Sequence, residues 1–106
     1  MKIRFSLVVP LFALAAALPV TTQAADLEAG KEKAAMCAGC HGADGRAANP
    51  AWPNLAGQNV DYLKAQLLAF KAGARKNDLM SPMAQALSDE DVENVAAWFS
   101  SLSPCK

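Results

Sequence analysis

Apolar and small residues recur at helical spacing in three segments of the chain, and the pattern predicts a helix in each. The segments are residues 26–38, residues 58–72 and residues 88–103. Gly73 follows the second segment as a helix C-cap, and Ser88 with Asp91 opens the third in the pattern of a capping box. No stretch alternates apolar and polar residues long enough to predict a strand. The predicted fold class is therefore all-α.

Two irregular connections separate the three predicted helices. Residues 41–57 form a connection that is long for so small a domain, and wrapping around an inserted cofactor would explain its length. Residues 74–87 contain the run Met80-Ser81-Pro82-Met83. We expect this run to be a loop, because proline interrupts a helix.

The start of the chain is typical of a secretory signal peptide. Lys2 and Arg4 are basic, residues 5–18 are mostly apolar, and small and polar residues follow up to Ala24. The apolar stretch is shorter than the about 20 residues that span a bilayer, so an uncleaved membrane anchor is the less favoured alternative. We expect a signal peptide over residues 1–24 and one domain over residues 25–106, exported to the periplasm with no stable membrane insertion.

The charge balance limits the choice of partner. The ten acidic residues all follow the predicted cleavage site, whereas two of the ten basic residues precede it, so the mature domain is mildly acidic. There is no basic run, and we expect no nucleic-acid partner. A domain this small often needs a covalent link or a cofactor to be stable.

Cys37, Cys40 and His41 form the motif C-x-x-C-H, which is typical of covalent haem attachment. Two thiols three positions apart on a helical turn can reach the two vinyl groups of one porphyrin, and the next histidine then lies under the iron. A zinc site would need a second pair of ligands, yet His41 is the only histidine and Cys105 the only other thiol. A redox dithiol of the thioredoxin type would need a βαβ context. The motif predicts one haem c, bound through Cys37 and Cys40.

One histidine leaves the second axial position of such a haem undecided, and because the chain has no second histidine the strong candidates are Met36, Met80 and Met83. Met36 lies beside Cys37, on the same side of the haem as His41, and cannot reach the opposite face. Met80 and Met83 follow about 40 residues later, where the chain can return across the porphyrin. The residues alone leave both of them open.

Apolar side chains in the first connection and the second helix are expected to keep water away from the haem. They are Trp52, Leu55, Leu63, Leu67 and Phe70. One haem edge should remain near the surface, around Ala38 and Gly39 and around residues 80–83, where small side chains permit close approach.

The sequence resembles the class I cytochromes c, specifically the short bacterial periplasmic type and each half of its dihaem relatives. The resemblance covers essentially the whole mature chain. It rests on Gly30 and on residues 34–35, 37–42, 53–58, 80–83, 87–91 and 95–99. It implies the small class I cytochrome c fold, in which three main helices and long loops wrap around one covalently bound haem.

The same resemblance implies roles for individual residues. Met80 would be the axial ligand and Met83 a residue of the pocket. The carbonyl of Pro53 would accept a hydrogen bond from His41, with Pro50 as a nearby alternative. Gly30 would pack against an aromatic ring of the last helix, either Trp98 or Phe99.

A histidine–methionine iron has no open position for a substrate, so we expect an electron-transfer protein and not an enzyme. The favoured function is a periplasmic one-electron carrier between donor and acceptor redox proteins. An alternative is the haem subunit of a larger oxidoreductase complex, because Cys105 lies outside the family pattern and could form a disulfide with a partner or a second copy. A further alternative is a haem enzyme or gas sensor with a labile sixth ligand.

Overall fold

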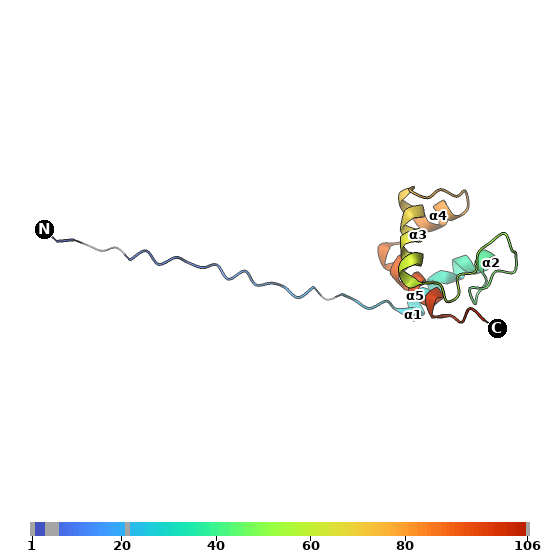
Figure 1. Ribbon diagram of the computed structural model, residues 1–106, viewed down its shortest axis with the longest axis horizontal. Helices are drawn as coiled ribbons and strands as arrows, with labels where there is room; N and C mark the ends of the chain where they lie inside the picture. Colours follow the sequence, from blue (N-terminus) through green and yellow to red (C-terminus); the bar gives the residue numbers. More distant parts are fainter. Residues whose placement is uncertain (1, 4–6, 21, 106) are drawn as a thin grey trace.

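The computed structural model describes residues 2–3, 7–20 and 22–105, and within these ranges the regular elements are all helices (Figure 1). The described residues before Asp26 run away from the domain as an extended arm. In this described part of the chain, no helix has the length and apolar composition needed to cross a bilayer. The prediction of an all-α fold is confirmed.

The first helical segment, which consists of three consecutive elements, is longer than predicted. Helix α1 (Leu27–Ala34) begins where the side chain of Asp26 accepts a hydrogen bond from the backbone N–H of Ala29. It continues through the 3-10 helix η1 (Ala35–Cys37) into α2 (Ala38–His41). The segment ends at Gly42, whose φ of 82° lies in the region that favours glycine. The boundary predicted at residue 38 was therefore wrong by three residues, and the whole C-x-x-C-H motif lies on helical turns.

The two longer helices begin as the sequence predicts, and the first of them also ends as predicted. Helix α3 (Val60–Ala72) is capped by Asn59, whose side chain accepts from Tyr62 N, and it ends at Gly73 in the left-handed conformation. Helix α5 (Asp89–Ser101) begins with the capping box of Ser88 and Asp91. It ends two residues earlier than predicted, because Leu102 is already extended.

The second connection contains a helix that the sequence did not predict. Helix α4 (Met80–Gln85) includes Pro82, and the prediction of a loop at this run was wrong. Proline is tolerated here because Pro82 lies in the first turn, where a backbone N–H has no acceptor within the helix. Asn77 stabilises the start of α4, because its Oδ1 accepts hydrogen bonds from the N–H groups of Leu79 and Met80, each at 2.9 Å.

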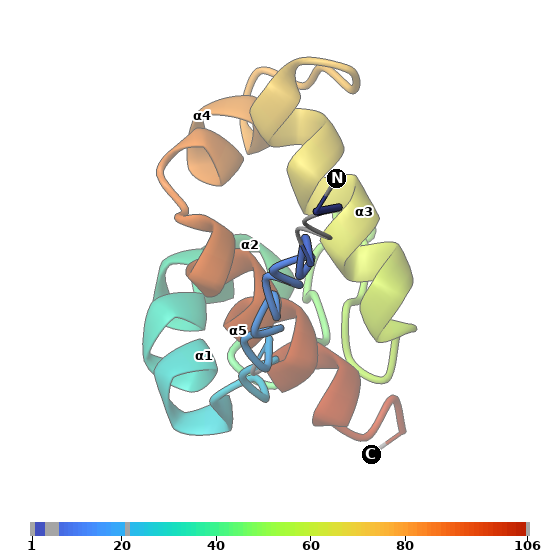
Figure 2. The same ribbon diagram turned by 90° about the vertical axis from the view of Figure 1, so that its left-hand side faces the viewer.

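Helix α5 lies between α1 and α3, and α4 packs on α3 (Figure 2). A small buried cluster joins α1, α3 and α5. Its members are Ala34, Leu63, Val95, Ala96 and Phe99. Gly30 lets α1 and α5 approach closely, because a Cβ at this position would collide with the backbone carbonyl of Asn94 and lie 3.1 Å from Trp98 Cβ. Of the two aromatic residues expected beside Gly30, the structure brings Trp98 close through its Cβ, and the nearest atoms belong to the backbone of Asn94.

The capping box leads to a pH-dependent prediction. Asp91 accepts from the backbone N–H of Ser88 at 2.9 Å and lies 3.4 Å from the Lys33 ammonium, and these groups hold the pKa of Asp91 below its ordinary value. Asp91 therefore contributes stability above about pH 4, and the contribution is lost as the pH falls through the lowered folded-state pKa. We expect Asp91→Asn to cost several tenths of a kcal/mol up to about 1 kcal/mol at pH 7, and less at pH 3. Thermal unfolding at the two pH values measures the difference, and an equal cost at both would contradict it.

Candidate functional site

The two cysteines of the motif lie on consecutive helical turns in different surroundings. Cys37 is half-buried and packs against the core cluster, whereas Cys40 is exposed. Burial, and to a smaller extent the neighbouring Cys40, raises the pKa of the Cys37 thiol. Before the haem is attached, Cys37 is therefore a neutral thiol at neutral pH.

His41 is the buried member of the motif, with 7% of its surface exposed. Its Nδ1 lies 2.8 Å from the carbonyl oxygen of Pro53, which can only accept a hydrogen bond. Nδ1 therefore carries the proton, and Nε2 keeps the lone pair that can bind a metal ion. The contact implied for Pro53 is present in the structure.

The apolar residues predicted to line the site fall into two groups. Leu55 and Leu67 are half-buried and pack against the same cluster as Cys37, and Leu63 is a member of that cluster. Trp52 is half-buried in the connection that also carries Pro53. Half-buried apolar side chains can cover a flat apolar ligand and lose their remaining exposed surface against it.

The methionines of α4 are also half-buried. Met80 is the first residue of α4 and Met83 lies three residues later, so both are on one side of the helix. The two thiols can bond to the vinyl groups of a porphyrin, whereas an imidazole with a free Nε2 and a methionine thioether are ligands that suit a haem iron and suit Mg²⁺ or Ca²⁺ poorly.

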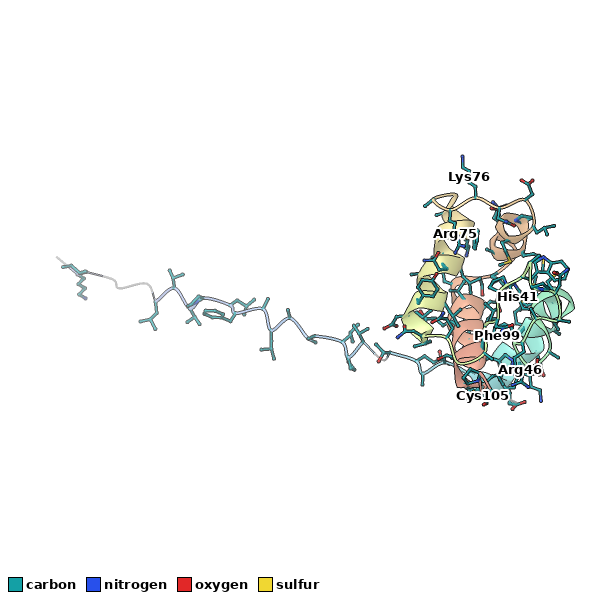
Figure 3. All side chains as sticks on the ribbon, turned by 45° about the vertical axis from the view of Figure 1, so that its right-hand side comes forward. His41, Arg46, Arg75, Lys76, Phe99 and Cys105 are labelled. Carbon is teal, nitrogen blue, oxygen red and sulfur yellow. The ribbon has the colours of Figure 1, made fainter. Side chains whose placement is uncertain are left out.

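Arg46 lies near Cys105, at the end of the domain opposite Arg75 and Lys76 (Figure 3). Its guanidinium donates to the carboxylate of Asp44 at 2.6 Å and to the backbone carbonyls of Ser103 and Cys105 at 2.9 and 3.1 Å. The C-terminal segment is thus held in place, with Cys105 exposed. The role of Arg46 was not predicted, because its contacts with Ser103 and Cys105 lie 57 and 59 residues away in the chain.

A second set of contacts that was not predicted surrounds Pro53. The side chain of Asn54 accepts from the backbone N–H of Ala47 at 2.8 Å, and the carbonyl of Gly45 accepts from Leu55 N and Ala56 N. Neither Asn54 nor Gly45 carries reactive chemistry, so the sequence gives no signal for this arrangement.

Comparison with known proteins identifies the class. The family model described as "Cytochrome c" matches residues 27–103. Cytochrome c-554(548) of Halomonas halodenitrificans is 47% identical over 81 residues, which cover 74% of this chain and 98% of that protein. A thiosulfate dehydrogenase electron acceptor of Stutzerimonas stutzeri is 45% identical over 69 residues, 62% of this chain and 32% of that protein.

The fold has a solved counterpart as well. The crystal structure of reduced recombinant cytochrome c4 from Pseudomonas stutzeri superposes with a TM-score of 0.71 at 45% identity. The match covers 76% of this chain and 47% of that one. The chain therefore spans almost the full length of the first relative, about half of cytochrome c4 and about a third of the electron acceptor.

The chain belongs to the cytochrome c family, as the match over residues 27–103 shows. It carries one haem c, bound covalently through Cys37 and Cys40, and it is an electron-transfer protein rather than an enzyme. The predictions of family, fold class and cofactor are confirmed.

Proposed function

We propose that His41 and Met80 are the axial ligands of the haem iron and that the chain is a periplasmic one-electron carrier. The observation that carries the proposal is the hydrogen bond from His41 Nδ1 to Pro53, because it directs the lone pair of Nε2 away from that acceptor and leaves it available to iron. Met80 and Met83 are both half-buried in α4, and Met80 is favoured because the resemblance to the class I cytochromes c assigns the ligand to the first methionine of the pair. The pocket residues proposed with them are Trp52, Pro53, Leu55, Leu63 and Leu67.

The haem supplies a one-electron couple, and the protein has to keep its surroundings constant while the charge changes. His41 is held by Pro53, and Leu63 is fixed in the core, so these groups need little rearrangement. A Cβ added at Gly39 would meet nothing within 4 Å, and Cys40 beside it is exposed. A redox partner can therefore approach closely at this edge, in the small short-lived interface that electron transfer uses.

Spectroscopy of the exported protein tests the proposal. We expect a mature chain that begins at Ala25, a covalently bound haem, a methionine–iron absorption band in the oxidised form, and no CO binding to the reduced form at neutral pH. CO binding without that band would instead support a haem enzyme or gas sensor. Intact-mass measurement tests the cleavage after Ala24 separately from the ligation.

A second candidate function is that of an electron-accepting subunit attached to an oxidoreductase. It is supported by the similarity to a thiosulfate dehydrogenase electron acceptor and by Cys105, which the Arg46 contacts present at the surface. Under this proposal the native protein migrates on a non-reducing gel as a larger disulfide-linked species. Cys105→Ser should convert that species to the monomer and leave the absorption spectrum unchanged. If the native protein migrates as a monomer on the non-reducing gel, the result contradicts the subunit role and supports a free electron carrier.

A further inference from the structure

We propose that Asn54 is a positioning residue for His41 and that it tunes the redox potential without touching the haem. The inference rests on the proposed role of His41 as an iron ligand. It assigns to the side chain of Asn54 the task of keeping the Pro53 carbonyl at hydrogen-bond distance from His41 Nδ1.

The geometry of the peptide unit carries the first step. The carbonyl of Pro53 and the N–H of Asn54 belong to one planar group, so the orientation of this carbonyl follows the placement of Asn54. Pro53 has no N–H with which to fix itself. Asn54 Oδ1 accepts from Ala47 N at 2.8 Å, and the next residue, Leu55, donates from its N–H to Gly45 O at 2.7 Å. These two hydrogen bonds fix the peptide plane from its Asn54 side.

The second step is that residues 45–47 are themselves tied to His41. Gly42 follows His41 directly, and its carbonyl accepts from Gly45 N at 3.0 Å. Arg46 N donates to the Asp44 side chain at 3.1 Å within the same turn. The backbone that carries the imidazole and the carbonyl that lies 2.8 Å from it are thus both tied to the short segment of residues 42–47.

The third step connects this distance to the iron. A hydrogen bond from Nδ1–H to a carbonyl makes the imidazole more basic and so stabilises the ferric state. When Asn54 Oδ1 is removed, the Pro53 peptide can rotate and the hydrogen bond weakens. The imidazole then donates less electron density, and the midpoint potential rises.

The same connection contains a matched control. Asn49 Oδ1 accepts from Ala51 N at 2.8 Å, and both asparagines are exposed. Asn49→Ala therefore removes a similar side-chain hydrogen bond of equal length from the same connection, without touching the contact to Ala47. Asn54→Asp keeps an acceptor for Ala47 N and should preserve the His41 contact.

The test uses the holoprotein and two measurements. In Asn54→Ala we expect a higher midpoint potential than in Asn49→Ala, and a roughly fivefold to tenfold faster solvent exchange of the His41 Nδ1 proton, which is the factor for loss of one ordinary hydrogen bond. NMR of the reduced protein measures the exchange, and Asn54→Asp should keep it slow. Equal potentials and equal exchange in the two alanine variants would overturn the proposal, while the parent spectrum would still show whether histidine binds the iron.

Discussion

Replacing Met80 with alanine should remove the methionine–iron band of the oxidised protein and lower its midpoint potential. A thioether is a soft, neutral ligand that stabilises ferrous iron, so its loss favours the ferric state. We expect a drop on the order of 0.1 V or more, within the range of about 0.8 V that axial ligands set. The reduced variant should also bind CO, because one coordination position becomes open. Redox titration and CO difference spectra measure both effects.

Met83→Ala is the matched control for this prediction. Both methionines are half-buried on one side of α4, and alanine favours a helix, so neither substitution should unfold α4. We expect Met83→Ala to keep the band and to shift the potential far less. The reverse result, with the band lost only in Met83→Ala, would identify Met83 as the axial ligand.

Local sequence signals account for the parts of the fold that were predicted. The cap residues Asn59, Gly73 and Ser88 act through atoms within a few positions of themselves, so their effect can be read from the sequence. Helix α4 was missed because Pro82 suggested a break. Its position in the first turn, together with the contacts of Asn77, became evident only from the structure.

The candidate site also contains one part that the sequence predicts and another part that only the structure shows. Cys37, Cys40 and His41 are adjacent in the chain, and their chemistry follows from their spacing. The hydrogen bond from His41 to Pro53 spans 12 residues and was implied only by resemblance. The contacts of Asn54 with Ala47 and of Arg46 with Cys105 depend on how the connections fold back, and hydrophobic periodicity carries no information about that.

The close approach of α1 and α5 depends on one missing side chain. Gly30 is buried, and the carbonyl of Asn94 occupies the space where a Cβ would point. The side chain of Asn94 adds a direct link, since its Oδ1 accepts from Asp26 N at 2.8 Å. Because a backbone carbonyl within a helix cannot rotate away, a larger residue at position 30 must push the two helices apart.

Gly30→Ala should therefore destabilise the protein, although the same change usually stabilises a helix by about 1 kcal/mol. We expect overpacking at Asn94 to outweigh that gain, for a net loss of about 2 kcal/mol and a fall in Tm of roughly 8–16 °C. Gly39→Ala is the control, because Gly39 lies in α2 with no atom within 4 Å of its would-be Cβ. Thermal unfolding of both holoproteins should show a loss in the first and no loss in the second. Equal Tm values for the two variants would mean that α1 and α5 can separate at no cost, which would contradict the role assigned to Gly30.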